Sequence, residues 1–267
     1  MIFLKSKSPG RQLSYICFRI IRRIVQAVYP KIKIEGLENL PDGPCLLVGN
    51  HSKMNGPIIS ELYIPGKHAT WCASEMMNIR EVPGYAYKDF WSKKPKCIRW
   101  FYKLSSYIIA PLCVCVFNNA DTIPVYRDGR IIKTFRETVN VLSEGYKVTV
   151  FPEHAKPHNN IVNDFQEGFV DVAKLYYKKT GRALPFVPVY IAPRLRTIYI
   201  GKALYYEPGA EKAAERRRIC TELMGRITDM ALSLPEHTVI PYTNMPKRLY
   251  PKNISSEVTA SHEKAPC

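Results

Sequence analysis

Residues 45–57 read CLLVGNHSKMNGP, an apolar run that ends just before the polar pair Asn50 and His51. A short apolar run followed by turn residues is typical of a buried β-strand, which we expect over Cys45–Val48. Pro57 suits the first turn of a helix, so a helical segment is expected over Pro57–Leu62. His51 then lies at a strand-to-helix junction, where α/β sheets carry their sites. A histidine held by structural hydrogen bonds would fit the same position, so His51 alone does not decide between the two roles.

Strands and helices alternate along the rest of the chain. Further strands are expected over Lys31–Glu35, Thr122–Tyr126, Lys147–Phe151, Phe186–Ile191 and Thr197–Ile200. Further helices are expected over Arg130–Ser143, Phe169–Lys179 and Ala210–Leu232. The alternation predicts an α/β fold, with one mixed-sheet domain over residues 31–252 and helices on both faces of the sheet. We expect an N-terminal amphipathic helical segment over residues 1–30 and a flexible tail over residues 253–267.

The N-terminal segment has an unusual distribution of charge. Over residues 11–28, four arginines fall on one side of a helical wheel and the apolar residues fall on the other. An ordinary surface helix usually mixes charge signs on its polar face, whereas this face has arginine and no acid. The pattern favours a helix that lies in a bilayer interface with its arginines at the headgroups.

A second basic stretch lies in the first half of the chain. Six basic residues interleave with five aromatic ones over residues 88–103, and an apolar run follows over Tyr107–Phe117. Eleven residues with a proline among them are too short to span a membrane. Interleaved basic and aromatic residues suit lipid headgroups or single-stranded nucleic acid, and the adjoining apolar run favours lipid. A core segment with a solvated basic flank is the alternative.

The overall composition excludes some classes of protein. The chain has 267 residues, 46% of them apolar, which predicts a packed core. Its formal net charge of +16 favours anionic partners, among which nucleic acid, anionic lipid and phosphorylated substrates all stay open. Eight cysteines without a C-x2-C pair do not fit a zinc site, so reduced thiols are expected.

Two further polar residues follow predicted strands. Arg127 follows the strand that contains Ile123-Pro-Val-Tyr, and an arginine there can hold a phosphate through paired N–H bonds. Glu153 follows the strand that ends in Val150-Phe-Pro. Each alone reads as an ordinary surface residue. Together with His51, however, both are predicted to lie at strand ends of one sheet.

Several ordered blocks resemble the glycerolipid acyltransferases of the 1-acylglycerol-3-phosphate acyltransferase type. Residues 36–41 (GLENLP) are similar to the family's lead-in, Asn50-His51 to its N-H-x4-D motif, and Phe151-Pro-Glu153 to its F-P-E-G motif. Ile123–Arg127, Phe165–Gly168, Val187–Tyr190 and Gly201-Lys202 resemble the family's remaining blocks. The resemblance covers roughly residues 30–205, and its weight lies in the order and spacing of the blocks.

The resemblance implies a chemistry for these positions. His51 would be the general base that takes the proton of the acceptor hydroxyl. Arg127 would bind the acceptor phosphate, and Glu153, also a candidate catalytic residue, would serve acceptor binding or the architecture of the site near it. Phe151, Pro152, His154 and Gly168 would be substrate-binding positions. The acyl donor would be acyl-coenzyme A or acyl-carrier protein, with no metal and no prosthetic cofactor.

The chain departs from the family pattern at two positions. Gly56 occupies the place of the aspartate that orients the imidazole, where loss of the carboxylate can cost about 10⁴-fold in turnover. Neighbouring Asn55 could bond the imidazole, and Glu153 is the first candidate to replace the carboxylate. His154 occupies the place of the motif's glycine and is a candidate for proton handling. With His158 it forms an i, i+4 pair, but the prolines nearby argue against a helical metal site.

The resemblance and the charge pattern together predict a function. We expect a peripheral or monotopic enzyme at the cytoplasmic face of a membrane with anionic lipid, acylating a lysophospholipid or glycerol phosphate. The alternative is a catalytically weak or inactive relative that acts as a lipid-binding protein. The sequence has no motif for nucleic-acid binding and favours no particular oligomeric state.

Overall fold

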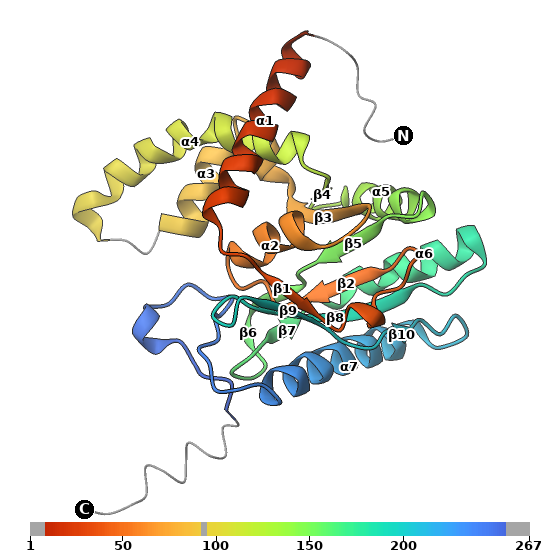
Figure 1. Cartoon of the computed structure of the whole chain (residues 1–267). Coiled ribbons are helices and arrows are strands. Elements are labelled where there is room, and N and C mark those ends of the chain that lie inside the picture. Colours follow the sequence, from red (N-terminus) through yellow and green to blue (C-terminus); the bar gives the residue numbers. More distant parts are fainter. Residues whose placement is uncertain (1–8, 92–94, 255–267) are drawn as a thin grey trace, which may run out of the picture. The chain divides into compact units, whose positions relative to one another are not determined.

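The structure, a computed structural model, describes residues 9–91 and 95–254, and the chain divides into two compact units (Figure 1). Unit 1 comprises residues 1–30 and 69–137, and unit 2 comprises residues 31–68 and 138–267. The expected tail lies outside the described residues from residue 255 onward, as do Lys93 and Lys94 of the basic stretch. The domain boundaries expected from the sequence stay predictions.

Unit 2 is built on a mixed β-sheet with the strand order β1-β9-β8-β2-β5. Its strands are β1 (Lys33–Glu35), β2 (Leu46–Gly49), β5 (Lys147–Val150), β8 (Pro185–Ala192), β9 (Thr197–Ile200) and β10 (Leu204–Tyr205). Strand β2 pairs in parallel with β5 and β8, whereas β8 pairs antiparallel with β9 and β10. The α/β class with a mixed sheet, predicted from the sequence, is confirmed.

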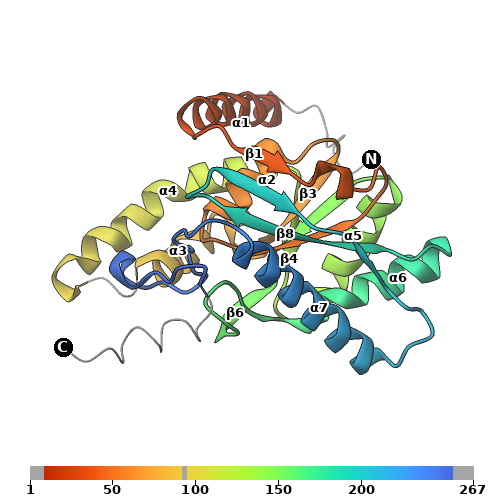
Figure 2. The ribbon, with the colours of Figure 1, turned by 60° about the horizontal axis from the view of Figure 1, so that its bottom comes forward.

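The middle of this sheet is fully buried. Leu46, Leu47 and Val48 of β2 have no exposed surface, as expected for a strand covered on both faces. Unit 2 also contains α2 (Asn55–Tyr63), α6 (Asp171–Thr180), α7 (Lys212–Leu232), the hairpin of β6 (Glu153–Pro157) and β7 (Asn163–Phe165), and the 3₁₀ turns Leu37–Asn39, Glu167–Val170 and Lys247–Leu249. Helix α7 packs on β8 and runs along the sheet in both views (Figures 1 and 2).

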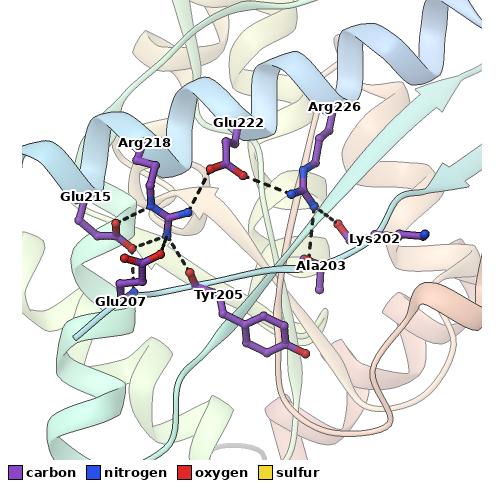
Figure 3. Close-up of polar contacts among 8 residues, drawn as sticks. All are labelled: Lys202, Ala203, Tyr205, Glu207, Glu215, Arg218, Glu222 and Arg226. Carbon is purple, nitrogen blue, oxygen red and sulfur yellow. Dashed lines mark hydrogen bonds and ion pairs between the residues drawn. The ribbon is translucent and has the colours of Figure 1, made fainter. Parts of the chain in front are cut away.

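A network of charged side chains ties α7 to the segment after β9 (Figure 3). The Arg218 guanidinium bridges Glu215 and Glu222 and also donates to the Tyr205 carbonyl. About two turns further on, Arg226 donates to the Lys202 carbonyl. The helix thereby donates to two main-chain carbonyls of the segment after β9, those of Lys202 and Tyr205.

Unit 1 contains the N-terminal helix and the long apolar helix. Its elements are α1 (Pro9–Val28), β3 (His68–Ala73), the 3₁₀ turn Ser74–Met77, α3 (Val82–Ala86), the π-helical turn Tyr87–Trp91, the 3₁₀ turn Lys96–Ile98, α4 (Arg99–Asn119) and β4 (Thr122–Val125). Helix α5 (Ile131–Ser143) begins in unit 1 and ends in unit 2. Strands β3 and β4 pair in parallel. Helix α1 packs on α4, where Ser14 accepts a hydrogen bond from Asn119.

The structure differs from the sequence expectation most clearly at the apolar run Tyr107–Phe117. This run lies inside α4, which continues through Pro111 for 21 residues. Within the described part of the chain, Lys96–Asn119 is the one helical segment long and apolar enough to cross a membrane, judged by length and composition only. Few of its side chains are buried, so it differs from a core helix of similar length.

Candidate active site

His51 lies just beyond the carboxyl end of β2, a central strand of the unit 2 sheet. Asn50 follows the strand and is buried, and its side-chain amide bonds both main-chain groups of Ile191 in β8, at 2.7 and 3.0 Å. This pair of bonds joins the end of β2 to β8. The position from which His51 leaves the sheet is therefore fixed.

The turn after His51 has a strained main chain. Ser52 and Lys53 have φ angles of 48° and 56°, in the left-handed region that side chains disfavour by roughly 1–2 kcal/mol per residue. Asn55 stabilises the turn, because its backbone N–H and its side-chain amide both donate to the Ser52 carbonyl. This contact gives Asn55 a role in the shape of the turn. A bond from Asn55 to the imidazole stays a prediction.

Glu153, the first residue of β6, stabilises the same turn. Its carboxylate is 3% exposed, and it accepts the backbone N–H of His51 at 2.5 Å and that of Asn163 at 2.8 Å. Burial raises the pKa of Glu153 to about 7, while the two N–H bonds oppose the rise. Both bonds go to the main chain. Glu153 therefore holds the main chain of His51 in position. A direct action of Glu153 on the His51 imidazole stays a prediction.

Gly56 is closely surrounded, although the family pattern has aspartate at this position. A Cβ added to Gly56 would lie 2.4 Å from the His51 carbonyl oxygen and 3.0 Å from the Phe151 ring. The first atom is backbone and cannot move without the turn. The turn in its present form therefore accepts glycine, and an aspartate at 56 requires a different main-chain path.

Two aromatic rings flank the His51 imidazole edge-on. The Phe151 ring lies 5.3 Å away at 61°, and the Tyr242 ring lies 5.6 Å away at 75°, both measured between ring centroids. Gly49 and Gly56 leave room for Phe151, since a Cβ at either position would contact its ring. The imidazole is thus held between a residue of the predicted motif and one far outside it.

The other predicted positions near Glu153 have structural contacts. Pro152 is buried, and its carbonyl accepts the Gln166 N–H. The His154 ring accepts the Lys156 N–H within its own hairpin. Gly168 lies exposed in the 3₁₀ turn Glu167–Val170. The structure therefore brings His51, Phe151 and Glu153 together. The substrate-binding roles of Phe151, Pro152, His154 and Gly168 stay predictions.

Arg127 belongs to unit 1, where it follows β4. It is exposed, and its guanidinium carbon lies 5.7 Å from the centre of the Tyr85 ring. Burial raises the pKa of Tyr85 to about 12, so its hydroxyl is neutral beside the arginine at physiological pH. The adjacent residues Tyr126 and Arg130 line an open pocket of about 480 Å³ in the same unit. Its remaining lining is mostly apolar and includes Met77, Ile79, Val114 and Pro124.

Residues 9–91 and 95–254 contain no cluster of metal-ligating side chains. No group of three or more His, Cys, Asp or Glu side chains there could hold an ion. The two histidines of the predicted pair make separate contacts, since the His158 ring lies 3.2 Å from the Asp164 carboxylate.

Three contributors to the site were not predicted from the sequence: Asn163, Tyr242 and Tyr250. Tyr250 accepts a 2.6 Å hydrogen bond from Lys53, and the Lys53 ammonium lies 4.8 Å from the centre of its ring. Tyr242 and Tyr250 lie 191 and 199 residues beyond His51 in the chain. No local spacing rule connects them to the histidine.

Comparison with known proteins identifies part of the chain. The model of the acyltransferase family matches residues 31–192, which begin just before β1 and end with β8. Among solved structures, the chain is similar to PlsC from Thermotoga maritima, a 1-acyl-sn-glycerophosphate (LPA) acyltransferase. That match has 17% sequence identity and a TM-score of 0.46, and it covers 88% of this chain and 86% of the other. A search of curated proteins found no match.

Proposed function

The chain belongs to the acyltransferase family, and on this premise we propose that it acylates a lysophospholipid or glycerol phosphate. The acyl group would come from a thioester, either acyl-coenzyme A or acyl-carrier protein. The reaction is of the 1-acylglycerol-3-phosphate type and belongs to phospholipid biosynthesis. It needs no metal and no prosthetic group, because the thiol of the donor is itself a good leaving group.

In this proposal His51 is the general base. Its imidazole takes the proton of the acceptor hydroxyl while the oxygen attacks the thioester carbonyl. The tetrahedral intermediate then expels the thiolate, which recovers the proton from the imidazolium. Glu153 and Asn55 keep the His51 turn in place through the main chain, so the base does not have to be ordered during the reaction.

One observation carries the proposal. Two predicted motif residues that are 102 positions apart meet directly, since the buried Glu153 carboxylate accepts the His51 N–H. Burying a carboxyl group is costly, and its pKa is raised to about 7. A buried carboxyl group of this kind beside a half-buried histidine favours a chemical role over a purely structural one.

The acceptor phosphate is assigned to Arg127. The guanidinium is exposed at the end of β4, and the pocket beside it combines an apolar lining with two charged residues, Glu81 and Arg130. A lysolipid has the same combination of an apolar chain and a charged headgroup. Unit 1 therefore offers a fitting receptor for the acceptor.

Unit 1 also supports membrane association. Leu13, Ile16, Ile20 and Ile24 of α1 are each more than half exposed and form one stripe on the helix. On α4, Trp100, Leu104 and Ile108 form a second exposed stripe. Exposed apolar side chains of this size, next to arginines, suit a bilayer interface. We propose peripheral or monotopic attachment at the cytoplasmic face, to membrane that contains anionic lipid.

Gly56 favours a second candidate, a lipid-binding relative with little or no catalysis. Without the family's aspartate, the imidazolium formed during transfer lacks its usual charge partner. The two candidates predict the same vesicle binding. They differ only in turnover.

Acyl transfer by the purified full chain in mixed micelles separates the two. Donors would be acyl-coenzyme A and acyl-carrier protein, and acceptors would be lysophosphatidate, glycerol 3-phosphate and a lysolipid without a phosphomonoester. We expect transfer to phosphomonoester acceptors that disappears in His51→Ala. Protein that binds anionic vesicles but shows no transfer above His51→Ala with any pair would identify the lipid-binding relative.

A further inference from the structure

The segment after α7 forms a strap, residues 233–253, that returns to the His51 turn (blue in Figures 1 and 2). It lies beyond residue 192, where the match to the acyltransferase family ends. The two ends of the strap, around Thr238 and Lys252, pair with each other, and we call this paired part the neck. Thr238 and Lys252 form an antiparallel bridge, and Val239 donates to the Pro251 carbonyl.

Buried polar groups fix this neck to the body of unit 2. Asn253 is buried, accepts the His237 N–H at 2.7 Å and donates to the Ala231 carbonyl at the end of α7. His237 is also buried. One of its ring nitrogens faces the Pro235 carbonyl and must carry the proton, so the other accepts the Tyr190 hydroxyl of β8.

The loop above the neck contacts the strained turn at two points. Tyr242 presents its ring edge-on to the His51 imidazole. Tyr250 accepts a hydrogen bond from Lys53, one of the two residues with left-handed backbone. Glu153 and Asn55 hold the main chain of the turn, while these two tyrosines contact its side chains.

We propose that the strap completes the catalytic centre, with Tyr242 and Tyr250 as positioning residues for the His51 imidazole and its turn. The inference rests on the proposed acyl transfer at His51. It extends the site from the family-matched residues 31–192 to a segment that the match leaves out. The fixed neck matters for this role, because a loop anchored at both ends by buried groups places its tyrosines reproducibly.

The test combines a spectroscopic measurement with kinetics on the full chain in micelles. Imidazole ¹³C–¹H spectra contain signals from six histidines, and His51→Ala identifies the His51 signal. Tyr242→Ala is expected to displace that signal and to lower kcat by about 10-fold or more, with both KM values unchanged, because misplacing a base costs turnover. Tyr242→Phe keeps the ring and should restore both.

Tyr250→Phe is a milder variant that should fold like wild type, because it removes only the hydroxyl group that accepts the Lys53 hydrogen bond. It should lower kcat less than Tyr242→Ala does, at an unchanged circular dichroism spectrum. Tyr205→Phe is the matched control, because Tyr205 is an exposed tyrosine of β10 whose ring points away from the charged network (Figure 3). It should change neither readout.

The two proposals fail in different ways. A His51 signal that stays in place in Tyr242→Ala, with kcat equal to wild type, would overturn the role of the strap. A displaced signal in a protein that shows no acyl transfer would support the positioning role and refute the proposed function.

Discussion

Helices α1 and α7 are both amphipathic, yet only α7 buries its apolar face. Ile219, Leu223 and Ile227 of α7 are fully buried. In α1, Ile16, Ile20 and Ile24 have the corresponding helical spacing but are more than half exposed. Helix α7 packs on the sheet of its own unit and needs no further apolar partner. The exposed isoleucine stripe of α1 instead favours contact with an apolar environment outside the chain.

The charges of the two helices differ in the same way. Arg218 and Arg226 of α7 form ion pairs with glutamates of the same helix (Figure 3). Helix α1 has arginines and no acidic residue. Its positive charge is thus unbalanced within the helix and suits anionic headgroups. The difference between the two helices supports our proposal that unit 2 performs the chemistry and unit 1 contacts lipid.

The largest expected effect tests the chemistry in unit 2. His51→Ala should lower acyl transfer on the order of 10³-fold or more, because a general base typically contributes 10²–10⁴-fold. The measurement is initial rate against enzyme concentration in mixed micelles. His158→Ala is the matched control, since His158 pairs with Asp164 in the β6–β7 hairpin region, and comparable losses in both variants would contradict the assignment.

The next effect tests the apolar stripe of α1. Ile16→Glu with Ile20→Glu should weaken binding to anionic vesicles by about 10²-fold or more, given roughly 1.5–3 kcal/mol for each buried isoleucine. Gln12→Glu with Gln26→Glu introduces the same charge on the same helix, outside the stripe, and should have a much smaller effect. Equal losses in a co-sedimentation assay would show that charge alone governs binding.

Arg127→Ala tests the acceptor site of unit 1. Removing a bond between charged groups costs about 1.5–3 kcal/mol, so the acceptor KM should rise roughly 10- to 100-fold. The donor KM should change little. Arg136→Ala is the comparison, because Arg136 is an exposed arginine of α5 in the same unit and does not line the pocket. Equal increases in both KM values for Arg127→Ala would contradict phosphate binding.

Gly56→Ala tests the turn that lacks the family's aspartate. The added Cβ meets the His51 carbonyl oxygen, and overpacking of this kind costs about 1–3 kcal/mol of unfolding free energy. Gly225→Ala in α7 is matched, because its Cβ would meet open space, and it should stabilise the helix slightly. Denaturant unfolding followed by circular dichroism measures both. A Gly56→Ala variant as stable as wild type would show that the turn tolerates a side chain.

A further expected effect is a pH dependence of stability caused by Glu153. Its pKa is raised from 4.5 to about 7 on folding, so between these values the folded protein holds a proton that the unfolded chain has released. Stability conferred by the protonated form is complete below about pH 4.5 and is lost as pH rises to about 7. Glu153→Gln cannot titrate and should lack this decline. Parallel stability curves for the two proteins from pH 4.5 to 8 would argue against the raised pKa.

Much of the scaffold follows from local sequence patterns. All six predicted strands are present, and the basic helix expected over residues 11–28 corresponds to α1 at Pro9–Val28. Strand β3 and the full length of α4 were missed, because β3 lacks clear alternation and Pro111 made a long helix look improbable.

The site was predictable only where motif residues occupy fixed places in the fold. His51 and Glu153 meet because each follows a strand of the same sheet, and β2 and β5 are neighbours. Tyr242 and Tyr250 contact His51 and Lys53, respectively, through the strap, whose path depends on the buried pair of His237 and Asn253. Such long-range packing leaves no periodicity in the sequence.

The most direct measurement of the central claim is acyl transfer to a water-soluble acceptor, glycerol 3-phosphate, with vesicle binding measured in parallel. We predict that the α1 variant Ile16→Glu with Ile20→Glu keeps transfer to glycerol 3-phosphate and loses vesicle binding. We predict the reverse for His51→Ala, which should bind vesicles and transfer nothing. Loss of both properties in either folded variant would contradict the division of chemistry and lipid contact between the two units.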